Sequence, residues 1–218
     1  MITIHKDMFS PEEIKELLDF YHDEKTMVDP RFYIPGHRQK CPTWDGTNWP
    51  RDSVKRVVDA VLPEGYKTDL ILFYEVGAGG LRVHTDGFIT PESSTYRNIA
   101  IPLYSEGPAS TVFFNNWWFG PKALFVNCDT VPENPYNMWS NEFQKMTNFT
   151  DKPFDPKMHE RYLSHIPIEH LYGLEFDQEV TWHVGDCFVA DSQQVHGGGQ
   201  PIGNEYKIGL TIFTHIDD

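Results

Sequence analysis

Histidines placed beside carboxylates are the residues of this chain best suited to chemistry. A His-x-acid triplet occurs four times, at His5–Asp7, His22–Glu24, His84–Asp86 and His215–Asp217. On an extended strand, residues i and i+2 leave the same face, so both side chains of such a triplet can reach one metal ion. With a distant histidine, the set becomes two imidazoles and one carboxylate, which can hold Fe(II) and leave three positions open for ligands.

Sequence context distinguishes one of the four triplets. His22 lies at the end of an amphipathic helix pattern, where residues i and i+2 point apart. His5 precedes that helix, and His215 has no later histidine as a partner. Only His84 and Asp86 end a strand pattern, follow a glycine-rich turn and have candidate histidines downstream.

The third ligand predicted from the sequence is His196. It follows an apolar strand and precedes three consecutive glycines, which let the backbone approach closely and leave room for a ligand. His183, in the preceding strand pattern, is the alternative third ligand. Three more histidines lack the spacing of a helical zinc motif and are interpreted as structural or surface residues: His159, His165 and His170.

A lysine begins the last strand pattern, eleven residues after His196. On that strand Lys207, Gly209 and Thr211 share one face, opposite three apolar residues. A cation, a gap and a hydroxyl on one face suit a small dicarboxylate beside the metal. Lys207 could instead be a solvated lysine that protects an edge strand from pairing.

Taken together, these residues make the sequence resemble the Fe(II)- and 2-oxoglutarate-dependent oxygenases, in particular their prolyl-hydroxylase-like members. The family pattern is HxD, a distal His, and a Lys or Arg about ten residues later, and the matching positions are His84, Asp86, His196 and Lys207. Residues 73–80 resemble the tyrosine-then-glycine approach to HxD, and 97–103 with 110–113 are similar to the two strands that follow. Gly209 departs from the pattern, because many relatives that use Arg carry Ser or Thr there.

The resemblance implies that His84, Asp86 and His196 hold Fe(II), with 2-oxoglutarate and O2 as cosubstrates. The far carboxylate of 2-oxoglutarate would pair with Lys207. Three other residues are candidate contacts for the cosubstrate: Tyr74, Thr211 and Arg97. The implied reaction is oxidative decarboxylation to succinate and CO2, coupled most often to hydroxylation of a second substrate. Tyr74 could equally pack as a half-buried aromatic residue.

Two alternative functions use the same residues. The chain could be a cupin-type metalloenzyme that binds metal through the same ligands without 2-oxoglutarate, or a non-catalytic jelly-roll binding module. An interior Lys207 favours the 2-oxoglutarate enzyme over the first alternative, because a site without that dicarboxylate has no evident need for the lysine.

The hydrophobic periodicity predicts a mainly β fold with supporting α-helices, specifically a double-stranded β-helix or jelly roll. Two early helices are expected, one opened by a capping box of Ser10 and Glu13 and one over 51–62, separated by an irregular loop over 25–50. A third helix is expected to begin at Asp155-Pro156. The predicted strands are 1–4, 70–76, 81–86, 97–104, 111–114, 179–183, 187–191 and 206–215.

The chain of 218 residues is expected to form one oxygenase domain, with residues 1–68 as helical support and 115–178 as an insertion. Its net charge of −14 disfavours nucleic acid and anionic membranes as partners, which leaves a small molecule or a peptide as the expected substrate. No apolar run is long enough to span a membrane. The three cysteines form no CxxC pair and are interpreted as reduced thiols of a cytoplasmic protein, with Cys187 in the core.

Overall fold

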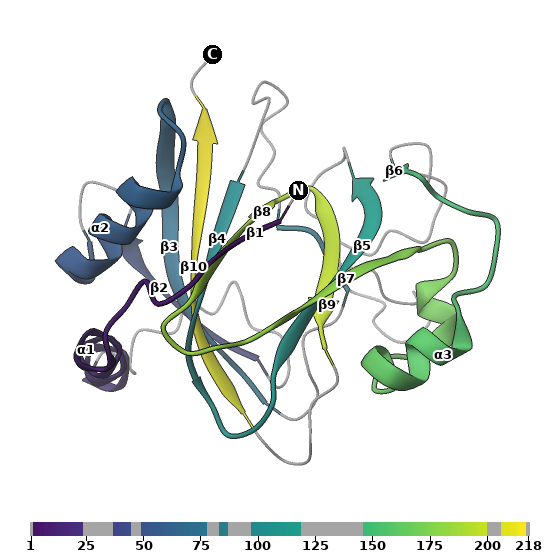
Figure 1. The fold of residues 1–218 in the computed structure, drawn as a ribbon, viewed down its shortest axis with the longest axis horizontal. Helices are drawn as coiled ribbons and strands as arrows, with labels where there is room; N and C mark the ends of the chain where they lie inside the picture. The colour runs from purple at the N-terminus through teal and green to yellow at the C-terminus, as the bar shows by residue number, and fades with distance from the viewer. Residues whose placement is uncertain are drawn as a thin grey trace.

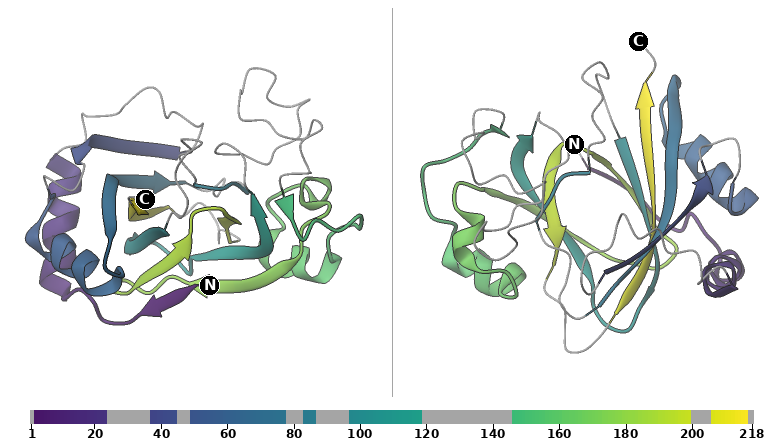
Figure 2. Two further views of the ribbon diagram at one scale, coloured as in Figure 1. Left: turned by 90° about the horizontal axis from the view of Figure 1, so that it is seen from above. Right: turned by 180° about the vertical axis from the view of Figure 1, so that it is seen from behind.

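The computed structural model describes residues 2–23, 37–44, 49–77, 83–86, 97–118, 146–199 and 206–216, with the backbone alone for 37–44. Two antiparallel sheets face each other, with helices α1 and α2 outside the larger sheet and α3 outside the smaller one (Figure 1). Seen from above, the strands wrap around a common interior (Figure 2). The predicted mainly β jelly roll with supporting helices is therefore confirmed.

The larger sheet has six strands in the order β1-β8-β4-β10-β3-β2. Their bounds are β1 (Thr3–His5), β2 (His37–Trp44), β3 (Tyr66–Val76), β4 (Arg97–Ser105), β8 (Cys187–Asp191) and β10 (Lys207–Ile216). The last strand, β10, lies between β3 and β4 and pairs with both along most of its length. Side chains on the inner face of β10 therefore lie at the centre of this sheet.

The smaller sheet is built around β5 (Ser110–Trp118), which pairs with the other three of its strands. These are β6 (Met146–Thr147), β7 (Phe176–Thr181) and β9 (Gln194–Gly198). Because β5 continues to Trp118 and β7 begins at Phe176, both strands extend into the range expected as an insertion. Residues 146–175 pack against the outer face of this sheet through an apolar cluster that includes Leu163, Ile166 and Leu171.

Three predictions about local structure were wrong. Strand β2 lies inside the range expected to be an irregular loop and pairs with β3. Strand β9 forms within the glycine-rich segment, because β5 supplies a partner for its backbone. In the predicted strand 81–86, the described residues 83–86 make one isolated bridge, from His84 to His196.

Apolar side chains fill the space on both sides of the larger sheet. On its outer face, Ile208, Leu210 and Ile212 of β10 are fully buried against a cluster that includes residues of α1 (Pro11–Asp23) and α2 (Asp52–Val61). Its inner face meets the smaller sheet through a second cluster that includes Leu72, Phe113, Phe188 and Phe213. Cys187 is a buried free thiol, as predicted, and burial raises its pKa to about 12.

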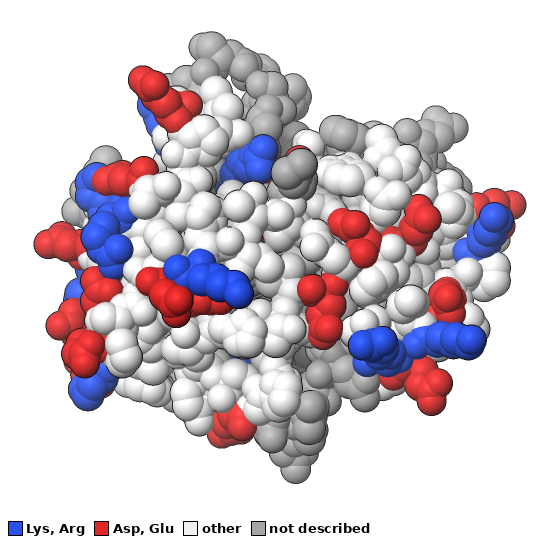
Figure 3. Space-filling view, in the orientation of Figure 1, with Lys and Arg blue, Asp and Glu red and all other residues white. Residues whose placement is uncertain are grey.

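The third helical region is short and changes its winding. Asp155 caps α3 (Pro156–Met158) by accepting a hydrogen bond from the backbone N–H of Lys157 at 2.8 Å. A π-helical turn (His159–Leu163) and a 3₁₀ turn (Ile168–Leu171) follow. Among the described helices, none combines the length and apolar character needed to cross a membrane. The face drawn in Figure 3 intersperses acidic and basic side chains.

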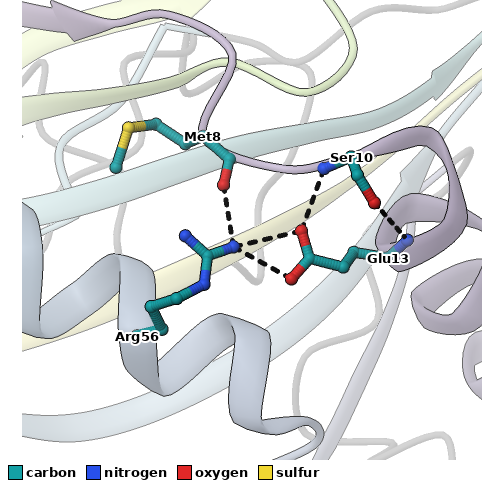
Figure 4. Close-up of polar contacts among 4 residues, drawn as sticks. All are labelled: Met8, Ser10, Glu13 and Arg56. Atoms are coloured by element: carbon teal, nitrogen blue, oxygen red, sulfur yellow. Dashed lines mark hydrogen bonds and ion pairs between the residues drawn. The ribbon is translucent and has the colours of Figure 1, made fainter.

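The predicted capping box forms at the start of α1. The Ser10 backbone N–H donates to Glu13 Oε2 at 2.9 Å, and the Glu13 backbone N–H donates to Ser10 Oγ at 3.2 Å (Figure 4). Arg56 of α2 donates to both Glu13 carboxylate oxygens and to the Met8 carbonyl oxygen, each at 3.0 Å. This contact links the two helices that support the larger sheet.

Ser10→Ala is expected to lower the free energy of unfolding by about 1 kcal/mol, because an N–H in the first turn of α1 loses its acceptor. Chemical denaturation followed by circular dichroism measures the change. Glu13→Gln is the control, since glutamine keeps an oxygen acceptor and loses only an exposed ion pair. Equal unfolding free energies for Ser10→Ala and the wild type would contradict a stabilising cap.

Candidate metal centre

Two backbone hydrogen bonds bring together histidines from distant parts of the chain. The His84 N–H donates to the His196 carbonyl at 2.8 Å, and the His196 N–H donates to the His84 carbonyl at 2.9 Å. Opposite residues in such an antiparallel bridge present their side chains on the same face. The two imidazole centroids are consequently 4.4 Å apart. His196 is fixed on its other side by β5, where it lies opposite Phe113.

Asp86 is placed beside both rings by its own backbone. Its N–H donates to the Ser192 carbonyl at 2.9 Å, which anchors the residue next to the start of β9. Asp86 Oδ1 lies 3.4 Å from His84 Nε2, and Asp86 Oδ2 lies 3.2 Å from His196 Nε2. One ligand atom from each of the three residues lies within 4.8 Å of the others.

Burial and charge act in opposite directions on the carboxylate. Burial alone would raise the pKa of Asp86, but attraction and hydrogen bonding by His196 and His84 hold that pKa well below its usual range. His196 Nδ1 lies 2.8 Å from the Gln194 carbonyl oxygen. With Nδ1 occupied by this carbonyl, Nε2 is the ring nitrogen that faces Asp86 and that a metal would take as its ligand. The site therefore offers an ionised carboxylate and at least one oriented imidazole nitrogen.

This donor set fits a divalent metal. Two imidazoles and one carboxylate suit a borderline ion such as Fe(II), and three protein ligands would leave further coordination positions for other ligands. Among the residues the structure describes, this is the only group of His, Cys, Asp or Glu side chains close enough to hold a metal. The alternative ligand His183 is exposed and lies outside the group.

The inner face of β10 carries the residues expected to contact a cosubstrate. Lys207, Gly209 and Thr211 follow one another on this face, while the intervening residues are buried in the outer apolar cluster. Tyr74 lies opposite Gly209 in the β3–β10 register, and its hydroxyl is hydrogen-bonded to Thr211. Burial first, and then the charge of Asp86, raise the pKa of Tyr74, so its hydroxyl stays protonated.

Gly209 makes the position of the Tyr74 ring possible. A Cβ atom at Gly209 would lie 2.6 Å from both Cζ and Oη of Tyr74, which is closer than atoms can pack. A Ser or Thr at this position would displace the phenol. Tyr74 therefore supplies a hydroxyl in the place where a side chain at position 209 would otherwise stand.

Lys207 reaches inward from the start of β10. Its Nζ donates to the Ser110 carbonyl at 3.2 Å and lies 4.0 Å from the centroid of the Trp182 ring. Burial lowers the pKa of Lys207 to about 7. The alternative of a solvated edge-strand lysine does not hold, because β10 has neighbours on both sides.

Arg97 does not lie beside the other residues predicted to contact the cosubstrate. It lies opposite Thr214, toward the far end of β10 from Lys207. Its neighbour Asn98 points into the interior, where it contacts Asp86, so alternation along β4 directs Arg97 to the other face. The strand geometry thus places Arg97 apart from Lys207, Tyr74 and Thr211, and its contact with a cosubstrate stays a prediction.

Sequence reasoning did not single out Asn98 and interpreted His165 as a structural or surface residue, yet both lie near the site. Asn98 donates from Nδ2 to Asp86 Oδ2 at 2.9 Å, and the period-two alternation of β4 could have placed it inward. Both ring nitrogens of His165 are buried, close to the backbone of Gly198. Burial, and then the nearby charges of Lys207 and His159, lower the pKa of His165 to about 4. No local pattern marks His165, because only the packing of residues 146–175 brings it there.

Comparison with known proteins establishes the fold and goes no further. No family model and no curated protein matches the sequence. A solved structure of the epimerase SnoN with Fe3+, alpha ketoglutarate and nogalamycin RO has a TM-score of 0.57 at 12% identity, covering 99% of this chain and 78% of that chain. HygX from Streptomyces hygroscopicus, with nickel and 2-oxoglutarate bound, has a TM-score of 0.52 at 11% identity, with coverage of 99% and 82%. A Pseudomonas putida prolyl-4-hydroxylase has a TM-score of 0.51 at 13% identity, with coverage of 99% and 92%.

Gly209→Ala is expected to destabilise the protein by about 1–3 kcal/mol, because the added methyl group collides with the Tyr74 ring. Denaturant unfolding of a double-mutant cycle with Tyr74→Leu tests the cause. The smaller leucine removes the colliding atoms, so Gly209→Ala should cost much less in that background. An equal cost in both backgrounds would show that the Tyr74 ring is not what excludes a side chain at this position.

Proposed function

We propose that this protein is an Fe(II)/2-oxoglutarate-dependent dioxygenase in which His84, Asp86 and His196 hold the metal. The observation that carries the proposal is the convergence of these three side chains at the end of a reciprocal backbone bridge. The jelly-roll fold shared with SnoN, HygX and the prolyl-4-hydroxylase supports it, since their structures are described as 2-oxoglutarate complexes or as a hydroxylase.

The cosubstrate would lie along the inner face of β10. Lys207 and Thr211 are four residues apart, which corresponds to about 13 Å along the strand. From Lys207, this segment of β10 runs toward the candidate metal centre. Lys207 would bind the far carboxylate of 2-oxoglutarate, as a cation that is already half-buried and has no carboxylate partner within the described structure. Tyr74 and Thr211 would donate hydroxyl hydrogen bonds between the two ends.

The residues of this chain would bind, orient and exclude water. Asp86 offsets part of the metal charge, and the Gln194 carbonyl keeps the His196 proton on Nδ1. Phe113, Phe188 and Phe213 form apolar walls between the sheets, which keep the interior dry. When bound, Fe(II), 2-oxoglutarate and O2 would supply the oxidising chemistry, with succinate and CO2 as products and hydroxylation of a second substrate as the expected outcome.

The proposed substrate is a small molecule or a peptide, and nucleic acid is not an expected partner because the chain carries a net charge of −14. A cytoplasmic location is proposed because the three cysteines form no CxxC pair and are interpreted as reduced thiols. The free thiol of Cys187, which is buried, agrees with this. Two other functions would use this fold: a cupin-type metalloenzyme without 2-oxoglutarate, and a binding module without activity. The inward position of Lys207 favours the proposed function over both.

Anaerobic addition of Fe(II) and 2-oxoglutarate is expected to produce the weak visible charge-transfer band of a metal-bound 2-oxo acid. Asp86→Ala should lose the band and the formation of succinate, because a metal ligand is gone. Fe(II) binding that Asp86→Ala abolishes, with no band when 2-oxoglutarate is added, would favour the cupin-type enzyme. Folded, metal-loaded wild type without any band would contradict the proposal, as would unchanged succinate formation by Asp86→Ala.

The affinity for 2-oxoglutarate is expected to fall as the pH rises above about 7. The ammonium of Lys207 must be protonated to pair with the carboxylate, and its pKa in the free protein is about 7. Binding then requires proton uptake, so Kd should rise toward tenfold per pH unit. His165, the described titratable group close to Lys207, has a pKa of about 4 and stays neutral across this range.

Calorimetric titrations of Mn(II)-loaded protein between pH 6 and 9 measure this dependence. Lys207→Arg is the matched control, since a guanidinium keeps its charge over the whole range and should flatten the curve. A pH-independent Kd for the wild type, or the same slope in Lys207→Arg, would show that Lys207 does not bind the carboxylate.

A further inference from the structure

The buried residue Asn98 of β4 contacts the candidate metal ligand Asp86. It is 6% exposed and lies opposite Ala190 of β8 and Phe213 of β10, inside the larger sheet. Its Nδ2 donates to Asp86 Oδ2 at 2.9 Å. An amide on a central strand is held in place on both sides, so its direction is well defined.

The chemistry of the pair determines which end of the amide faces Asp86. A carboxylate only accepts hydrogen bonds, so the Asn98 oxygen in that position would set two acceptors against each other. The N–H group must therefore face Asp86, which leaves the Asn98 Oδ1 atom on the other side. That oxygen is buried and has no hydrogen-bond partner among the described residues.

The orphaned oxygen makes a purely stabilising role for Asn98 a poor explanation. A buried acceptor without a donor is costly, and an apolar residue of similar size would fill the same space without that cost. The polar side chain therefore needs another reason to be there, and within the described part of the chain its amide donates to the candidate ligand Asp86.

The two oxygens of Asp86 have different surroundings. Oδ2 accepts from Asn98 and faces His196 Nε2 at 3.2 Å, whereas Oδ1 faces His84 Nε2 at 3.4 Å. An oxygen that already accepts an N–H hydrogen bond is the weaker donor to a metal. The environment thus distinguishes Oδ1 as the oxygen that faces an imidazole alone and accepts no hydrogen bond from the amide.

We propose that Asn98 is a positioning residue that holds Oδ2 of Asp86 in a hydrogen bond, so that the carboxylate binds the metal through Oδ1 alone. This inference rests on the proposed metal site. If Asp86 bound the metal through both oxygens, it would fill two coordination positions. The Asn98 amide would therefore keep one of these positions open for another ligand. Outer hydrogen bonds of this kind orient metal ligands and tune the affinity for the metal.

Substitution of Asn98 with measurement of Co(II) binding tests the inference. Asn98→Leu removes the N–H donor at similar volume and is expected to weaken Co(II) affinity by about 10–100-fold. The visible absorption of bound Co(II) should also change, because the carboxylate becomes free to bind through both oxygens. Asn98→Ala, where a water can replace the amide, should show a smaller change in both and serves if the leucine variant does not fold.

Thr214→Val is the matched control. Thr214 Oγ1 donates to the Arg97 carbonyl at 2.6 Å, and the Thr214–Arg97 pair is next to the Phe213–Asn98 pair in the β4–β10 register. This variant loses a buried hydrogen bond and should keep the affinity and spectrum of the wild type. A spectral change confined to the Asn98 variants is therefore not explained by loss of stability.

The outcomes separate the inference from the function on which it rests. Wild-type protein that binds Co(II) through Asp86, with unchanged affinity and spectrum in both Asn98 variants, would overturn the positioning role and leave the metal site intact. Wild-type protein whose Co(II) binding is absent, or is unaffected by Asp86→Ala, would overturn the metal site itself. Weaker binding with an altered spectrum in the Asn98 variants alone supports the inference.

Discussion

The reciprocal backbone bridge between His84 and His196 is the constraint on which the candidate site depends. It joins segments more than a hundred residues apart through two hydrogen bonds of 2.8 and 2.9 Å. Among the described residues, His84 belongs to no strand, so the bridge to His196 is what aligns its backbone. The pairing of β9 with β5 makes one half of the bridge rigid, and the other half is then aligned against it.

Burial of this site creates an electrostatic problem that the same residues solve. A carboxylate removed from water is costly unless it is paired. Asp86 is surrounded by two imidazoles and one amide N–H, and its pKa stays low despite burial. At the other end of the interior, Lys207 is a cation without a carboxylate partner in the described structure, and its pKa falls to about 7. A ligand with two carboxylates, one near each end, would balance the metal and the lysine together.

Much of the fold was predictable because its signals are local. The capping box of Ser10 and Glu13, the alternation of Lys207 to Ile212 and the core position of Cys187 each follow from a few neighbouring residues. Strands β2 and β9 were not predictable in this way, since they form where a neighbouring strand offers unpaired backbone groups. The positions of His165 and Asn98 at the site likewise depend on long-range packing.

Gly209 shows how one change in a sequence pattern can be explained by its partner in space. Along strand β10, the glycine at position 209 lacks the hydroxyl side chain that the family pattern places two residues after the cation. Viewed across the β3–β10 register, it is the space that the Tyr74 ring needs, since a Cβ atom would lie 2.6 Å from the phenol oxygen. Tyr74 of the neighbouring strand supplies a hydroxyl beside this position, and its hydrogen bond to Thr211 keeps it on the inner face. A pattern read along a single strand cannot register such an exchange, because the compensating residue lies on another strand more than a hundred residues away.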